Sequence, residues 1–352
     1  MFKKSHLIFL ILAIIIAVLF FILPRVFPSN LISPFFQGPD QTEKISQRII
    51  SPFNLDISKA KTISSLENIP RYLVYNSQTN KVYYAKGADI RLSPASFTKL
   101  LSAQIALDLV PKEYLITATK ESVDKVPTVL GLKVGEKLSV VDLLRAAIAT
   151  SANDAAETLS VGAAKAVGIS KAEFIYYMNA KATLLGLKNS HFVNSDGLDD
   201  QNQYSTLKDL AKLVNNVQKN YPEILEAAKS DNQDIQKTED HGSYYLPNWN
   251  GLLGVYPGVS GLKIAYTEEA GYSTIVVAQR NGYSMVAMVS GADSYLERDL
   301  AAADLLDAGF LAEGLPPLRI NKNKLNLHYK EWGDLARKIQ AELKAIENQN
   351  IN

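Results

Sequence analysis

The chain has 352 residues, of which 47% are apolar and 21% charged, and this composition excludes disordered, collagen-like and coiled-coil proteins. The 37 basic and 36 acidic residues nearly cancel, so we expect no nucleic-acid partner. Cysteine is absent, which excludes thiol catalysis, disulfides and cysteine-based metal sites. The four histidines have no metal-ligand spacing, so we expect no metal or other cofactor.

The first predicted element is a membrane anchor. An unbroken apolar run extends from Leu7 to Leu23 and follows Lys3 and Lys4. At about 1.5 Å per residue it nearly crosses a hydrocarbon core of about 30 Å. No small-residue cleavage site follows, which favours an uncleaved anchor over the alternative, a cleaved signal peptide. The positive-inside bias predicts that residues 1–28 form a cytoplasmic tail and single-pass anchor in the cell membrane, with the following domain extracytoplasmic.

Prolines punctuate residues 29–64, which we expect to form an extracytoplasmic linker. The folded domain is predicted to span residues 65–312. It should begin with a hairpin of strands at 72–75 and 81–85, joined by a polar turn. A helix should follow, with Ser93 as its N-cap and Pro94 at its first position, and end before residue 111.

The patterns of the remaining chain predict helices first and strands later. We expect helices at 139–148, 153–168, 171–185 and 205–217, strands at 261–266, 272–279 and 283–290, and a closing helix at 296–310. Strands near both ends with helices between them predict an α+β fold, in which an antiparallel sheet closed from both termini is flanked by helices and contains a helical insert. One N-terminal transmembrane helix would precede this domain.

Residues 313–352 form a C-terminal tail in this scheme. Trp332, Leu335, Ile339, Leu343 and Ile346 make the apolar stripe of an amphipathic helix. The charges around the stripe are mixed in sign, which favours packing against the protein over membrane binding.

Ser96 and Lys99 are the first candidate catalytic pair. A serine becomes nucleophilic only when a base lies within hydrogen-bond reach, and residues three apart on a helix are neighbours. The apolar surroundings of Lys99 would lower its pKa and make the neutral amine available as a base. The same Ser-x-x-Lys spacing recurs at Ser58, Ser122, Ser205 and Ser260, but only Ser96 combines a predicted helix start with an apolar setting for the lysine.

A Ser-x-Asn sequence provides a second candidate element, because a hydroxyl can relay a proton and a carboxamide can hold a substrate amide. Ser151 and Asn153 lie between two apolar helices, whereas Ser230-Asp231-Asn232 lies in a polar, weakly patterned stretch. We therefore choose Ser151 and Asn153. The competing interpretation of Asn153 is an N-cap of the following helix.

Three ordered motifs carry a resemblance to a known family. They are Ser93-Pro94-Ala95-Ser96-Phe97-Thr98-Lys99, Ser151-Ala152-Asn153-Asp154, and Gly258-Val259-Ser260-Gly261-Leu262-Lys263 followed by Tyr266. With these motifs the chain resembles the D-alanyl-D-alanine carboxypeptidases, the low-molecular-mass penicillin-binding proteins, from about residue 65 to 312. The resemblance implies a β-lactamase/transpeptidase-like fold.

The resemblance also implies a mechanism on the stem peptides of peptidoglycan. Ser96 would attack the bond between two terminal D-alanines, with Lys99 as general base and Ser151 as the proton donor to the leaving group. Asn153 would hold the substrate amide, and Lys263 would support Ser151 and bind the terminal carboxylate. Backbone N–H groups of Ser96 and Tyr266 would form the oxyanion hole. β-Lactams would act as covalent inhibitors.

One departure from the family pattern concerns its third motif, Lys-Thr-Gly or Lys-Ser-Gly, which here is Lys263-Ile264-Ala265. Ile264 lacks the hydroxyl that would bond the substrate carboxylate, and Ala265 adds a methyl group where the family has glycine. We expect impaired activity. The alternatives are a degenerate, non-catalytic homologue that binds peptidoglycan and a β-lactamase.

Overall fold

The computed structural model describes residues 38–49, 53–229 and 232–349. The predicted anchor at residues 7–23 and the alternative serine, Ser230, lie outside these ranges. The chain order of the elements is α2 (Thr42–Ser46), η1 (Ser64–Leu66), β1 (Arg71–Asn76), β2 (Val82–Lys86), η2 (Ala95–Thr98), α3 (Lys99–Leu109), β3 (Leu115–Thr117), α4 (Lys120–Val123), β4 (Lys137–Ser139), α5 (Val140–Arg145), η3 (Ala146–Thr150), α6 (Asn153–Ala166), α7 (Lys171–Leu184), α8 (Leu207–Asn220), α9 (Pro222–Lys229), β5 (Asn232–Ile235), β6 (Tyr244–Pro247), β7 (Val259–Ala265), β8 (Tyr272–Arg280), β9 (Tyr283–Ala292), α10 (Tyr295–Ala312) and α11 (Lys322–Gln349).

A five-stranded antiparallel sheet in the order β2-β1-β9-β8-β7 organises the domain. The N-terminal hairpin pairs with the last strand, so both ends of the chain close one sheet, as predicted. Asn281 and Gly282 in the β8–β9 turn have φ values of 47° and 84°, which suits the tight hairpin that an Asn-Gly pair indicates. Among the described strands β7 pairs only with β8, so it lies at the edge of the sheet with one side open to further pairing.

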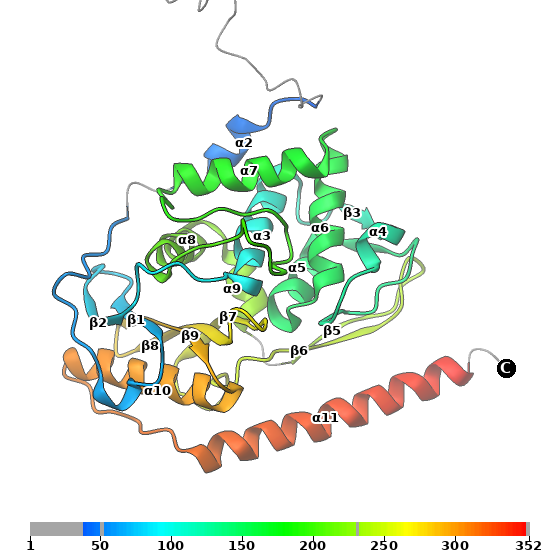
Figure 1. The fold of residues 1–352 in the computed structure, drawn as a ribbon. Coiled ribbons are helices and arrows are strands. Elements are labelled where there is room, and N and C mark those ends of the chain that lie inside the picture. The colour runs from blue at the N-terminus through cyan, green and yellow to red at the C-terminus, as the bar shows by residue number, and fades with distance from the viewer. Residues whose placement is uncertain (1–37, 50–52, 230–231, 350–352) are drawn as a thin grey trace, which may run out of the picture. The chain divides into compact units, whose positions relative to one another are not determined.

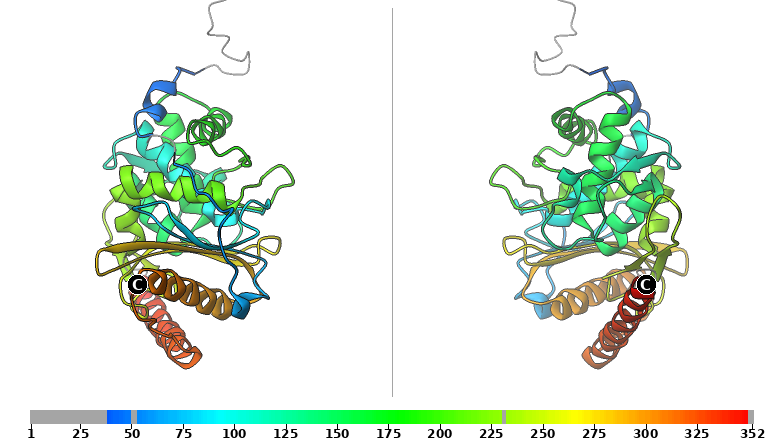
Figure 2. Two further views of the ribbon diagram at one scale, coloured as in Figure 1. Left: turned by 90° about the vertical axis from the view of Figure 1, so that its left-hand side faces the viewer. Right: turned by 90° about the vertical axis from the view of Figure 1, so that its right-hand side faces the viewer.

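Alternate side chains of each central strand face two separate cores. On β1, Leu73 and Tyr75 belong to one buried cluster, and Tyr72 and Val74 belong to the other. The first cluster lies under the helical insert that includes α3, α6 and α8, and the second lies under α10 (Figure 1). Figure 2 shows this arrangement edge-on, with the insert on one side of the sheet and α10 and α11 on the other. The predicted α+β antiparallel fold is therefore confirmed.

Two differences from the predicted elements concern short strands. β3 pairs with β4, and β5 pairs with β6, in two-stranded sheets. These strands have three or four residues each, too few to give a periodic signal. β5 lies in the polar stretch where no regular structure was predicted, so tertiary pairing decided its conformation.

Part of the expected linker packs on the domain. Ile45 of α2, Phe53 and Leu55 are buried and belong to the core under the helical insert. The backbone N–H of Gln41 donates to the hydroxyl of Tyr177 on α7 at 2.9 Å. Three isolated apolar residues make no helical or strand period, which is why the sequence pattern did not predict this contact.

The C-terminal tail forms the long helix α11. Leu325 in its first turn is buried in the α10 core, and the Trp332 ring lies 6.4 Å from that of Trp249 and 4.4 Å from that of His328. Leu335, further along the expected stripe, is exposed. Among the described residues, none of the helices combines the length and apolar character needed to span a bilayer.

Candidate active site

Ser96 lies in a tight 3₁₀ turn that leads directly into α3. The predicted α-helical start at residue 94 is wrong, because residues 95–98 are 3₁₀ and the α-helix begins at Lys99. Ser93 does not cap the helix; its hydroxyl instead donates to Asp199 at 2.7 Å. Ala95 has a φ of 44°, a left-handed conformation that an L-residue seldom adopts.

Gly197 holds this turn from the other side. Its φ is +88°, and a Cβ atom there would lie 1.9 Å from the carbonyl oxygen of Ala95. Only glycine therefore allows the segment that contains Asp196 to pass against the backbone of the nucleophile turn. This close passage brings the backbone carbonyl of Asp196 into contact with Lys99.

Lys99 is fully buried, and its amine contacts three oxygen atoms. Its Nζ lies 2.8 Å from the Ser96 hydroxyl and 2.7 Å from the Asn153 amide oxygen, and it also donates to the backbone carbonyl of Asp196. The last two partners can only accept hydrogen bonds. They take both hydrogens of a neutral amine, so the nitrogen lone pair is left for the serine hydroxyl.

The surroundings of Lys99 favour that neutral form. Burial is the main cause that lowers the pKa of Lys99 from its ordinary value to about 7, and the positive charge of Lys125 contributes in the same direction. The carboxylates of Asp196 and Asp154 act in the opposite direction. Since an ordinary lysine has a pKa near 10.4, this environment makes a substantial fraction of neutral amine available around pH 7.

Asn153 orients the lysine and does not cap its helix, because α6 has no side-chain cap and Ala152 is the capping position. The Asn153 side-chain nitrogen donates to the carbonyl of Val126 at 2.9 Å, which turns its oxygen toward Lys99. The adjacent Asp154 accepts three backbone N–H groups of residues 130–132 at 2.7 to 3.1 Å. The first turn of α6 therefore positions both Lys99 and the loop at residues 130–132.

Ser151 and Lys263 form a second hydrogen-bonded pair. Ser151 follows the π-helical turn η3 and has a φ of 65°. Its hydroxyl accepts from Lys263 Nζ at 2.8 Å, and the same amine donates to the carbonyl of Ile264 at 3.0 Å. Burial, together with the positive charges of Lys99 and Arg298, holds the pKa of Lys263 well below its usual range.

The edge strand β7 carries the remaining predicted residues. Tyr266 follows its last residue and is 50% exposed, with its ring 4.4 Å from that of Tyr272. Ile264 is partly buried. Ala265 is fully buried within the core under the helical insert, so its methyl group contacts the core and does not line the free edge.

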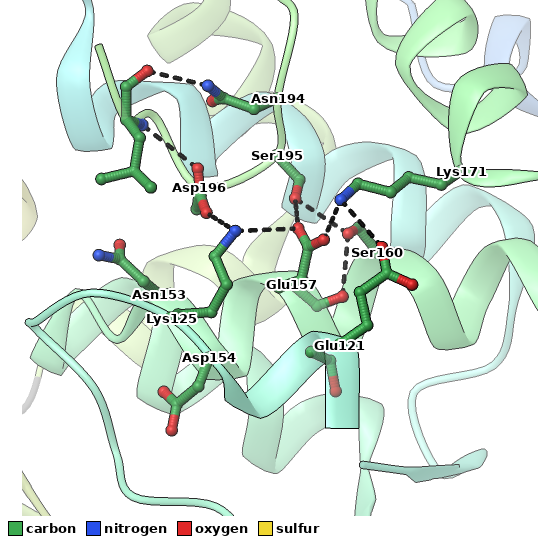
Figure 3. Close-up of polar contacts among 12 residues, drawn as sticks. Glu121, Lys125, Asn153, Asp154, Glu157, Ser160, Lys171, Asn194, Ser195 and Asp196 are labelled. Atoms are coloured by element: carbon green, nitrogen blue, oxygen red, sulfur yellow. Dashed lines mark hydrogen bonds and ion pairs between the residues drawn. The ribbon is translucent and has the colours of Figure 1, made fainter. Parts of the chain in front are cut away.

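Figure 3 shows a network of charged side chains that includes Asp196, the residue whose backbone carbonyl contacts Lys99. Lys125 Nζ contacts the Asp196 carboxylate at 2.6 Å and the Glu157 carboxylate at 3.9 Å. Glu157 also accepts from the Ser195 hydroxyl at 2.8 Å and pairs with Lys171. Each buried carboxylate thus has a cationic partner, and the network holds the segment whose carbonyl contacts Lys99.

Sequence reasoning missed several of these residues. Lys125 belongs to one of the Ser-x-x-Lys pairs that were set aside, and nothing in its spacing indicates its position beside the site. Asp196 precedes a Gly-Leu-Asp stretch, a weak signal. Arg298 on α10 is buried, bonds Asp299 at 2.7 and 2.8 Å, and affects Lys263 through its charge.

A partly exposed serine hydrogen-bonded to a buried lysine at a helix start, beside the edge strand of an antiparallel sheet, is the arrangement of a serine peptidase that uses a lysine base. The match to one such family covers residues 60–294, and the chain belongs to that family, the D-alanyl-D-alanine carboxypeptidases.

Individual relatives agree with this membership. The chain is 32% identical to D-alanyl-D-alanine carboxypeptidase DacF of Bacillus subtilis over 68% of its own length, and it spans 61% of that relative. The DD-transpeptidase of Streptomyces K15 has a similar structure, with a TM-score of 0.64 and 30% identity over 69% of this chain and 97% of that one. Penicillin-binding protein D2 of Listeria monocytogenes, solved with bound ampicillin, gives a TM-score of 0.59 and 29% identity over 69% and 97%.

Proposed function

We propose that this protein is a serine D-Ala-D-Ala carboxypeptidase that removes the terminal D-alanine from peptidoglycan stem peptides. The observation that carries the proposal is the hydrogen bonding of Lys99. Two obligate acceptors orient its hydrogens, and the Ser96 hydroxyl lies at 2.8 Å in the remaining direction. This geometry suits a base that takes a proton from a nucleophile.

Acylation would begin when the neutral amine of Lys99 takes the hydroxyl proton of Ser96. The Ser96 oxygen then attacks the carbonyl carbon between the two D-alanines. The backbone N–H groups of Ser96 and Tyr266 would stabilise the negative oxygen of the tetrahedral intermediate, a contribution worth about 3 kcal/mol for each donor.

Departure of D-alanine requires a proton on its nitrogen. Ser151 is suited to deliver this proton, because its hydroxyl is hydrogen-bonded to Lys263 at 2.8 Å. The terminal carboxylate of the peptide would lie near Lys263, and its negative charge would favour the protonated form of that amine, beside the positive charge of Arg298. Water would then attack the ester on Ser96, releasing the shortened peptide and restoring the hydroxyl.

The third motif limits this activity in our proposal. Ile264 offers no hydroxyl to the substrate carboxylate, and a charge-assisted hydrogen bond is worth about 1.5 to 3 kcal/mol. The intact serine–lysine pair favours an impaired enzyme over a non-catalytic homologue.

The same proposal includes the surroundings of the enzyme. We place the domain outside the cytoplasm, held at the cell membrane by residues 7–23, which agrees with a peptidoglycan substrate. β-Lactams should acylate Ser96, and the penicillin-binding neighbour with bound ampicillin supports this expectation.

Labelling with a fluorescent penicillin, followed by hydrolysis of a D-Ala-D-Ala peptide, tests the proposal. The full-length protein should become labelled and release D-alanine, and Ser96→Ala should do neither. Ser230→Ala is the matched control and should retain both properties. Loss of label in Ser230→Ala with retention in Ser96→Ala would reverse the choice of nucleophile. Rapid turnover of penicillin without accumulation of the acyl-enzyme would instead support a β-lactamase.

A further inference from the structure

A polar pocket of about 260 Å³ lies beside the nucleophile turn, outside the residues assigned above. Its lining includes Arg71 at the start of β1, Arg91 and Ser93 before η2, Tyr204, and Glu269 and Ala270 in the β7–β8 turn. Ser93 is three residues before Ser96, and Glu269 is three residues after Tyr266. The pocket is therefore lined by residues from both segments that carry the proposed oxyanion-hole donors.

Two guanidinium groups without carboxylate partners face this one pocket. Within the described ranges, neither Arg71 nor Arg91 forms an ion pair with an acidic side chain, although Glu269 also lines the pocket. The Nε of Arg71 is buried and lacks a hydrogen-bond partner among the described residues. Buried polar groups are normally satisfied, and this unpartnered donor belongs to a side chain that lines the pocket.

The Arg91 side chain is held in place before any ligand binds. Its guanidinium lies over the Tyr204 ring, 3.8 Å from the ring centroid, in a cation–π contact. A stacked guanidinium keeps its edge free for a planar anion, and the forked donors of arginine match a carboxylate. Two such groups in one pocket favour a carboxylate ligand.

The direction in which the peptide binds along β7 determines which part of the peptide reaches the pocket. Under the proposed function, the terminal carboxylate lies near Lys263 and the scissile carbonyl near Tyr266. A peptide that adds to the free edge of β7 therefore continues past Tyr266 with the residues on the acyl side of the scissile bond. The Asp199 carboxylate holds this end together, because it accepts from Ser93 at 2.7 Å and from Thr267 at 2.8 Å.

We infer that Arg71 and Arg91 form a subsite for a free carboxylate carried by the acyl side of the peptide substrate, upstream of its terminal D-Ala-D-Ala. This inference rests on the proposed function for the identity of the peptide. It adds a specificity determinant, since a peptide with such a carboxylate is preferred over an otherwise identical neutral one.

Binding and turnover of matched peptides test this subsite separately from catalysis. The peptides end in D-Ala-D-Ala and differ only in an N-terminal acetyl, succinyl or glutaryl cap, of which the last two carry a free carboxylate. Affinities are measured by calorimetry on the full-length chain with Ser96→Ala. We expect at least one carboxylated peptide to bind about tenfold more tightly than the acetyl peptide. This ratio should fall close to one in Arg91→Met and in Arg71→Met.

Arg337→Met on α11 is the matched control, because it removes the same charge from a helix that does not line the pocket. It should keep the ratio. Arg91 is exposed, so Arg91→Met tests the subsite even if Arg71→Met fails to fold. Equal binding of all three peptides, or an unchanged ratio in Arg91→Met, would overturn the inference. The chain with Ser96 intact separates the two hypotheses. Equal hydrolysis of the carboxylated and acetyl peptides would contradict only the subsite. Preferential binding of a carboxylated peptide without hydrolysis would contradict only the proposed activity.

Discussion

Replacing Lys125 by methionine should change the pH dependence of acylation. Lys125 is 16% exposed and contacts the fully buried Asp196 carboxylate at 2.6 Å, while the carbonyl of Asp196 contacts Lys99. Two effects then act in the same direction. Loss of the Lys125 charge removes a repulsion that lowers the pKa of Lys99, and the unpaired Asp196 carboxylate attracts the lysine more strongly.

The size of the effect follows from the fraction of neutral amine. With a pKa of about 7, roughly half of Lys99 is neutral at pH 7. A rise of about one unit, equivalent to about 1.4 kcal/mol, leaves roughly a tenth neutral and slows acylation about fivefold at that pH. Above pH 9 nearly all of the amine is neutral in both proteins, so the two rates should converge.

The assay is the rate constant for acylation by a fluorescent penicillin between pH 5.5 and 10. In the unaltered protein this rate should rise with a midpoint near pH 7, and in Lys125→Met the midpoint should lie about one unit higher. Removing one partner of a buried ion pair also costs about 3 kcal/mol of stability, so thermal melting must show that the variant is folded.

Lys171→Met provides the matched control. It removes a cationic partner of Glu157 in the same network, but its charge is not among the influences on Lys99. It should lower the melting temperature and leave the acylation midpoint unchanged. An unchanged midpoint in Lys125→Met, or equal shifts in both variants, would refute the assignment of Lys99 as the base tuned by this pair.

Three further predictions concern the backbone, the third motif and the anchor. Gly197→Ala should displace the nucleophile turn and lower both the melting temperature and the acylation rate. Gly186 also has a positive φ, but a Cβ atom there would have no other atom within 4 Å, so Gly186→Ala should introduce only backbone strain and leave the acylation rate unchanged. Ile264→Thr should raise kcat/KM on a D-Ala-D-Ala peptide about tenfold, and adding Ala265→Gly should give no further gain because that methyl group is buried; no gain in the folded Ile264→Thr would contradict this. N-terminal sequencing of membrane-associated protein should find the chain intact, and a mature chain that starts after residue 23 would identify a cleaved signal.

Local patterns in the sequence were sufficient for much of the fold. Short apolar runs predicted the strands that became β1, β8 and β9, and the Asn-Gly pair between 272–279 and 283–290 indicates the tight turn that joins β8 to β9, because these features depend on neighbours in the chain. The choice of Ser96 rested on the same kind of information. A spacing of three residues brings a lysine to a serine whether the turn is 3₁₀, as found, or α-helical, as predicted.

Tertiary structure alone decided what surrounds that pair. The carbonyl of Asp196 contacts Lys99 across 97 residues of sequence, and Lys125 enters the network from a loop with no pattern of its own. Arg71 and Arg91 meet at one pocket because sheet pairing and the nucleophile turn bring them together. Burial, which shifts the pKa of Lys99, depends on how distant segments pack. A one-dimensional period describes only residues a few positions apart, so the sequence identifies the reacting groups, and packing determines their charge and their contacts.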